Sequence, residues 1–191
     1  PRVSGVYKID ENVSFFAGFS DTSTPNNGAM DSNGVVLPDR ATEIKEIGFK
    51  GDLWDQKLFA TLSLFENVRT NLVVPDVINI GASESSGEIT AKGIDLDVGI
   101  QVTENLELIG GVSTMSNTIT DDTRPERIGL GFRAIPDFTA SAFARYDFAD
   151  DSGLEGLSLG LGFIHEGERW GEANNRFLTP SYTKLDFMLW Y

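Results

Sequence analysis

The most constraining feature of this sequence is a strict two-residue alternation of apolar and other side chains. Between residues 138 and 148, one set of alternate positions has aromatic residues at both ends and alanines between them, and the other set is mostly polar. The same period recurs in residues 13–20, 58–64, 94–102 and 157–163. Successive side chains of a β-strand point to opposite faces, whereas a helix needs apolar residues three and four apart. The sequence therefore predicts an all-β protein.

The lengths of the connections between the predicted strands also follow a pattern. We expect nine strands, at residues 3–9, 13–20, 42–51, 57–67, 91–102, 106–116, 138–148, 156–165 and 181–191. Short connections at 10–12, 52–56, 103–105 and 149–155 alternate strictly with long ones at 21–41, 68–90, 117–137 and 166–180. An antiparallel up-and-down meander with all long loops at one end produces this order.

Two architectures fit such a meander. Outer-membrane β-barrels combine short turns at one end with long loops at the other, and their strands need only alternate apolar residues. A soluble β-sandwich also has alternating strands, but its connections need not alternate in length. The pattern favours the barrel and leaves the sandwich open. Because bacterial single-chain barrels have even strand numbers, we expect eight or nine strands that form part of a larger transmembrane barrel.

Composition excludes several classes of function. The net charge of −14 argues against a nucleic-acid partner, because phosphate binding requires a basic surface. The chain has no cysteine, so it has no disulfide framework, zinc–thiolate site or cysteine nucleophile. His165 is the only histidine, which excludes a metal site built from several histidines within this chain. We therefore expect no bound cofactor and no metal-ligating residues.

The sequence offers only weak candidates for catalysis, and we predict that the protein is not an enzyme. Residues 156–160 fit the Gly-x-Ser-x-Gly form, but alternation continues through Ser158, whereas a nucleophile elbow requires a sharp strand-to-helix turn. Asp95 and Asp97 share one face of a strand and are expected to line a wet interior. His165 lacks a second histidine and is expected at a surface or interface.

Short motifs along the whole chain resemble one known family. They comprise the strand–turn–strand of residues 1–20, the Leu-Pro-Asp segment with the following strand at 37–50, the strand and Arg-x-Asn end at 58–71, the Gly-x-Asp-x-Asp strand at 91–97, the Pro-containing strand start at 134–139, and the Pro-x-Tyr strand at 178–186. These motifs occur in the same order in TonB-dependent siderophore receptors, which the chain therefore resembles.

This resemblance implies a location and a function. It implies that residues 1–191 are the C-terminal portion of a receptor barrel in the bacterial outer membrane, with the plug domain and last strands absent. The expected function is uptake of ferric siderophores or similar metal chelates. The expected partners are the ferric chelate, outer-membrane lipid, and the TonB energy-coupling complex acting through the missing N-terminal region. The alternatives are a passive porin, a soluble β-sandwich that binds carbohydrate or protein, and an outer-membrane hydrolase.

The last long loop contains the most binding-like side chains. Arg169, Trp170, Asn174 and Arg176 lie close together in the sequence. Arginine can form two parallel hydrogen bonds to carboxylate or catecholate oxygens, and tryptophan provides an apolar anchor. We predict these four residues as ligand contacts. The alternative is a solvated loop with its aromatic residue folded against the rim.

Large aromatic residues at strand ends suggest membrane-interface positions. Tyrosine and tryptophan are enriched where a membrane meets water. We expect such positions for Trp54, Tyr146, Tyr182, Trp190 and Tyr191, with packing inside loops as the alternative.

Overall fold

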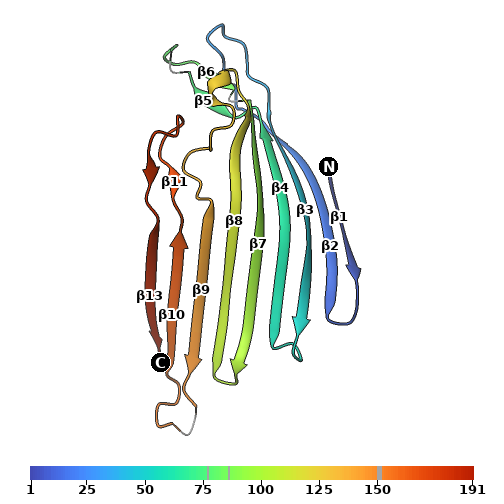
Figure 1. The fold of residues 1–191 in the computed structure, drawn as a ribbon, viewed down its shortest axis with the longest axis vertical. Coiled ribbons are helices and arrows are strands. Elements are labelled where there is room, and N and C mark those ends of the chain that lie inside the picture. The colour runs from blue at the N-terminus through green and yellow to red at the C-terminus, as the bar shows by residue number, and fades with distance from the viewer. Residues whose placement is uncertain (77, 86, 150–151) are drawn as a thin grey trace.

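The computed structural model describes residues 1–76, 78–85, 87–149 and 152–191, and it consists mainly of one antiparallel sheet (Figure 1). The sheet has nine strands in the order β1-β2-β3-β4-β7-β8-β9-β10-β13, so the predicted meander is confirmed. The strands are β1 (Arg2–Lys8), β2 (Val13–Thr24), β3 (Arg40–Leu53), β4 (Leu58–Thr70), β7 (Glu88–Thr103), β8 (Leu106–Asp121), β9 (Phe138–Asp147), β10 (Ser158–Glu166) and β13 (Tyr182–Trp190).

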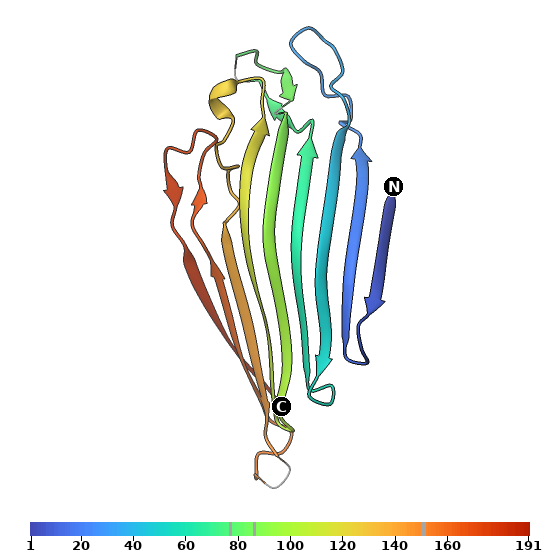
Figure 2. The same cartoon turned by 45° about the vertical axis from the view of Figure 1, so that its right-hand side comes forward.

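All long connections lie at one end of the sheet and the tight turns lie at the other (Figure 2). The long connections contain short elements that the alternation did not predict. These are β5 (Val73–Pro75), β6 (Ser83–Ser85), the 3-10 turn η1 (Pro125–Arg127), β11 (Arg169–Trp170) and β12 (Leu178–Thr179). The pairs β5–β6 and β11–β12 form two small separate sheets. Part of the predicted loop region is therefore ordered by its own backbone pairing.

Several strands extend further toward the long loops than predicted. Strand β7 begins at Glu88 instead of residue 91, and β8 ends at Asp121 instead of residue 116. The backbone ladder between them continues through Thr90 and Thr118, although apolar alternation has stopped there. Ladder hydrogen bonds join backbone groups and do not require apolar side chains. The predicted boundaries therefore marked the end of the apolar band instead of the end of the strand.

One face of the sheet, here called the apolar face, is continuous across the strands. In one row, Phe49 pairs with Leu62, Leu62 with Leu96, and Leu96 with Val112. Leu62 remains 44% exposed and Phe49 remains 48% exposed, so no other part of the described chain covers this face. The apolar face includes Phe15, Phe19, Ile47, Phe49, Leu62, Leu64, Ile94, Leu96, Val112, Leu161, Leu185 and Phe187.

The opposite face, here called the polar face, mixes charged residues with aromatic rings that lie over glycines. Its members include Glu46, Lys50, Thr61, Asp95, Asp97, Arg145, Lys184 and Asp186. Four phenylalanines each pair directly with a glycine of the next strand, namely Phe16 with Gly48, Phe59 with Gly99, Phe65 with Gly93 and Phe143 with Gly162. A Cβ atom on Gly99 would lie 2.0 Å from the Phe59 ring. The glycines therefore allow these rings to lie flat on the wall.

The buried core is small and lies at the loop end of the sheet. Ile89 and Ile119 are neighbours on β7 and β8, and they are only 4% and 2% exposed. Asp122 and Arg127 are buried close by in sequence, immediately after β8. In the described residues, each sheet other than the nine-stranded one has only two strands, so none provides the second layer of a sandwich. No helix in the described part of the chain is long and apolar enough to cross a membrane.

Candidate functional site: an arginine-lined cavity among the long loops

The four long connections are tied to one another by hydrogen bonds. The backbone N–H of Ser83 donates to the carbonyl of Met30 at 2.8 Å, which joins the first and second connections. The side chain of Asn175 accepts from the N–H of Gly131 at 2.7 Å and donates to its carbonyl at 2.8 Å. This two-sided contact joins the third and fourth connections. An ion pair between Arg124 and Glu84 joins the second and third connections, so the loop end is one connected assembly above the sheet (Figure 1).

A cavity of about 360 Å³ opens where the last three of these connections meet. Its charged lining consists of Arg124, Arg127 and Arg133, and the described residues that line it include no acidic side chain. Asn174 adds an amide. The remaining lining is apolar or glycine, from Val74, Pro75, Ile119, Gly131, Phe132 and Ala173. The cavity therefore offers hydrogen-bond donors on a largely apolar wall, which suits an anion.

A buried carboxylate fixes two of these arginines. The Asp122 side chain has no exposed surface; its Oδ2 lies 3.1 Å from Arg127 Nη1, and its Oδ1 lies 3.9 Å from Arg124 Nε. Arg124 also pairs with Glu84 of β6. A buried charge is tolerated only when it is paired, so the contact between Asp122 and Arg127 accounts for the burial of both side chains.

The third arginine differs from the other two. Arg133 is exposed, and no carboxylate in the described chain lies within ion-pair distance of it. The charges of Asp122, Glu84, Arg124 and Arg127 cancel, so Arg133 leaves the group with a net positive charge. An incoming anion would find its uncompensated partner at Arg133.

The structure separates the four residues that the sequence predicted as ligand contacts. Asn174 lines the cavity. Arg169 pairs with Glu166 at 3.1 Å and lies over the Tyr182 ring at 5.8 Å, so its charge is already engaged. Ligand contact by these residues stays a prediction, and the geometry favours Asn174 over Arg169.

Trp170 and Arg176 lie apart from the charged lining. A Cβ atom on Gly131 would lie 2.5 Å from the Trp170 ring, which shows that the indole packs against that backbone. The backbone N–H of Arg176 donates to the Glu172 carboxylate at 3.3 Å, and Arg176 does not line the cavity.

The cavity arginines were not among the predicted site residues. Three of the nine arginines in the chain occur between residues 124 and 133, although the net charge is strongly negative. This local enrichment within a long loop was an available signal. The sequence could not show that Asp122 would bury itself between two of these arginines.

Two of the predicted interfacial aromatic residues lie on the polar face instead. Trp190 pairs with Ser158, contacts the Phe143 ring at 6.3 Å between centroids, and lies under Arg145 at 5.9 Å. Tyr182 pairs with Glu166 on the same face. The interface prediction is wrong for these two residues, because they share alternate positions with Lys184 and Asp186. Tyr146 lies on the apolar face, opposite Leu159.

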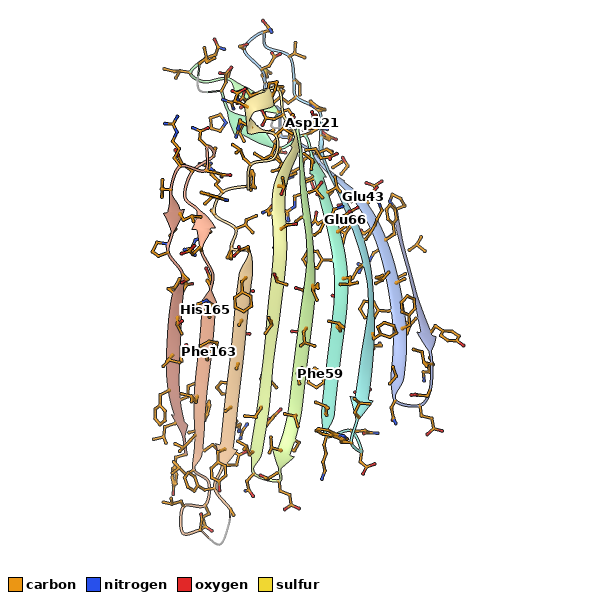
Figure 3. All side chains as sticks on the ribbon, in the orientation of Figure 1. Glu43, Phe59, Glu66, Asp121, Phe163 and His165 are labelled. Atoms are coloured by element: carbon orange, nitrogen blue, oxygen red, sulfur yellow. The ribbon has the colours of Figure 1, made fainter. Side chains whose placement is uncertain are left out.

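The weak catalytic candidates occupy structural positions. Ser158 is the first residue of β10, and its hydroxyl donates to the Asp147 carboxylate. His165 Nδ1 lies 2.9 Å from the Thr183 hydroxyl oxygen, on the next strand. Figure 3 shows His165 along the strand, away from the long loops. Asp147, the carboxylate beside Ser158, is also paired with Arg145 at 2.9 Å, and His165 lies on the opposite face of β10, so these groups form no Ser–His nucleophilic site.

Two exposed carboxylates organise turns within the loops. The backbone N–H of Val35 donates to Asp31 at 2.8 Å, and this bond is the main cause of a lowered pKa at Asp31. The side-chain amide of Asn79 donates to Asp76 at 2.8 Å and is the main cause of the lowered pKa of Asp76. Both groups therefore remain ionised at neutral pH and hold local turns instead of binding ligand.

The architecture defines a class of protein. An uncovered apolar face, a polar opposite face, tight turns at one end and long loops at the other are typical of the wall of an outer-membrane barrel. Residues 1–191 match the family described as TonB dependent receptor-like, beta-barrel. The chain therefore belongs to the TonB-dependent receptor family of the bacterial outer membrane. Its members are transporters, so the prediction of a non-enzyme is confirmed.

Curated relatives and solved structures agree with this assignment. The chain is 31% identical to the metal-pseudopaline receptor CntO of Pseudomonas aeruginosa over all of its length and 27% of that receptor. It is 25% identical to the ferrichrome outer membrane transporter/phage receptor of Escherichia coli over 97% of this chain and 24% of that one. The chain thus spans about a quarter of the length of these relatives.

The fold is also found in solved receptors. The crystal structure of BauA, the ferric preacinetobactin receptor of Acinetobacter baumannii, aligns with a TM-score of 0.81 and 25% identity, covering 99% of this chain and 28% of that one. The siderophore receptor PiuA of the same organism aligns with a TM-score of 0.80 and 19% identity, covering 98% and 28%. In such a barrel, the apolar face contacts lipid and the polar face lines the interior.

Proposed function

We propose that the receptor containing this chain takes up metal chelates, such as ferric siderophores, across the outer membrane. The observation that carries the proposal is the match of residues 1–191 to the receptor barrel family. The relatives support a metal chelate as cargo, since CntO is a metal-pseudopaline receptor and BauA a ferric preacinetobactin receptor. The cavity among the long loops provides a surface for first capture of such a ligand.

We further propose that residues 1–191 form the C-terminal portion of this barrel. The order of the motifs along the chain supports that placement. Energy would come from the TonB complex, acting through a plug region outside these residues. The part of the protein described here would form a lipid-facing wall and a share of the extracellular loops. It performs no covalent chemistry on the cargo in this proposal.

A deletion of the gene tests the proposed function. Cells starved of iron should lose uptake of at least one radiolabelled metal chelate, and the complemented strain should recover it. Uptake should also stop when TonB is absent. Unchanged uptake of every chelate in the deletion strain would contradict a transport role. Steady single-channel conductance of the purified receptor, without dependence on TonB, would instead favour a passive porin.

A further inference from the structure

The loop cavity has a charge that its surroundings do not share. The whole chain has a net charge of −14, and its long connections contain many acidic residues. The described lining of the cavity nevertheless contains three arginines and no carboxylate. Since like charges repel an anion from acidic surface, a cavity lined by three arginines and no carboxylate attracts an anion more than the acidic loop surface around it does. The ligand group that enters is therefore negatively charged.

The shape of the donors narrows the class of anion. A guanidinium presents planar, paired N–H donors that match the two oxygens of a carboxylate. Arg133 is free to make such a pair, and the Asn174 amide on the opposing loop adds another donor. Val74, Ile119 and Phe132 form apolar wall beside them. A low-dielectric surrounding strengthens a charge-assisted hydrogen bond once water is excluded.

The size of the cavity sets how much of a ligand it takes. Sites for small molecules usually span about 300–1,000 Å³. The volume of about 360 Å³ lies at the lower end of that range, so it suits one arm of a chelate better than a whole metal complex. The metal ion itself would lie outside the cavity, and the cavity residues would contact only the outer edge, or rim, of the complex.

The arrangement is also held in place before any ligand arrives. Asp122 fixes Arg124 and Arg127 from behind, and Asn175 fastens Gly131 to the last loop beside Asn174. The wall beside Arg133 and Asn174 is therefore already formed, and a site that is already formed loses less entropy on binding. We propose that this cavity binds a carboxylate on the rim of an anionic metal chelate, with Arg133 and Asn174 in direct contact with it. This inference rests on the proposed function and names the ligand class for it.

Binding measurements on the full-length receptor test the inference. The probes are ferric citrate and ferric ethylenediaminetetraacetate, which are anionic and carry carboxylates, and a neutral ferric trihydroxamate as the comparison. Arg133→Gln should weaken binding of the carboxylate chelates about tenfold or more, because hydrogen bonds to charged groups are worth about 1.5–3 kcal/mol. Asn174→Ala should have a smaller effect in the same direction. Arg40→Gln removes another exposed arginine at the loop end of the sheet that does not line the cavity, and it should leave binding unchanged.

The outcomes separate this inference from the proposed function. A receptor that takes up the trihydroxamate but binds neither carboxylate chelate would overturn the inference and leave the transport role intact. Equal losses for Arg133→Gln and Arg40→Gln would also overturn it, since the effect would then reflect overall charge. A receptor that binds none of these probes would also overturn the inference, whereas only unchanged uptake of every chelate in the gene-deletion strain would contradict the proposed function itself.

Discussion

The two faces of the sheet share one backbone but carry different side chains, which are apolar on one face and mostly polar on the other. On β4, Leu62 belongs to the apolar face and the adjacent Thr61 belongs to the polar face. Leu62 continues a row of large apolar residues, whereas Thr61 lies between Lys50 and Asp97. Successive side chains of a strand point in opposite directions. Two adjacent residues therefore differ in surroundings, one facing lipid and the other facing the barrel interior. The effect of a substitution on stability therefore depends first on the face of the sheet at which it occurs, and then on the chemistry of the new side chain.

The largest expected effect comes from placing the same charge on each face. Leu62→Arg should destabilise the folded receptor by about 2–4 kcal/mol, because an arginine near the middle of the lipid-facing band is poorly solvated. Thr61→Arg is the matched control and should cost much less, since Asp97 is its neighbour on the polar face. Urea unfolding of the receptor in vesicles measures both. Similar losses for the two variants would invalidate the assignment of faces.

A smaller effect is expected where rings lie over glycines on the polar face. Gly99→Ala should destabilise the receptor by about 1–3 kcal/mol, because the added methyl group overlaps the Phe59 ring. Gly18→Ala, on the same face, places its methyl group 4.0 Å from Ser4 and should be nearly neutral. Combining Gly99→Ala with Phe59→Leu should recover part of the loss. The same unfolding measurement decides whether the two sites are coupled.

The upper edge of the apolar face should tolerate loss of charge. Glu66 lies between Lys92 at 2.6 Å and Lys45 at 3.8 Å, and both lysine side chains are more than half exposed. Figure 3 shows Glu66 and Glu43 toward the loop end of the sheet. Glu66→Gln should change the free energy of unfolding by less than about 1 kcal/mol, because exposed ion pairs contribute little. A loss comparable to that of Leu62→Arg would show that this edge is deeper in the membrane than its charges indicate.

The smallest effect is expected in the loops, where the conformation depends on local hydrogen bonds and not on the division into an apolar and a polar face. Asp31 has a pKa lowered mainly by the N–H of Val35. A depressed folded-state pKa stabilises the turn above the unfolded value of 3.8, and this contribution is lost as the pH falls through the folded pKa. At pH 5, amide exchange at Val35 and Asn33 should therefore be slower in the native protein than in Asp31→Asn. This difference should disappear as the pH falls below 3.8. Equal protection in the variant at pH 5 would contradict this role.

Much of the fold could be predicted from local sequence. The alternation in residues 94–102 and 138–148 is a property of neighbouring residues, and it placed Asp95 and Asp97 together on one face. The same alternation places Trp190 on the polar face, because Trp190 shares alternate positions with Lys184 and Asp186. The interface prediction for Trp190 failed because it used residue type and ignored position along the strand.

The candidate site was less accessible from sequence. Arg169 had the right chemistry for a ligand contact, but Glu166 and Tyr182 engage it in the folded chain. Arg133 belongs to no recognisable motif. The cavity that it lines is completed by Asn174, which lies more than forty residues later in the sequence. Residue type alone could not distinguish an arginine that is paired from one that faces a cavity.

The sequence by itself determined the strands, their two faces and the end at which the long loops gather, because a period of two and the lengths of connections are local properties of the chain. Only the tertiary structure decided which loops meet. The contact between Asn175 and Gly131 and the burial of Asp122 between two arginines join segments that are distant in sequence or irregular in backbone. Such contacts are selected by the geometry of the whole assembly, since a loop without periodic hydrogen bonding takes its conformation from the groups it packs against.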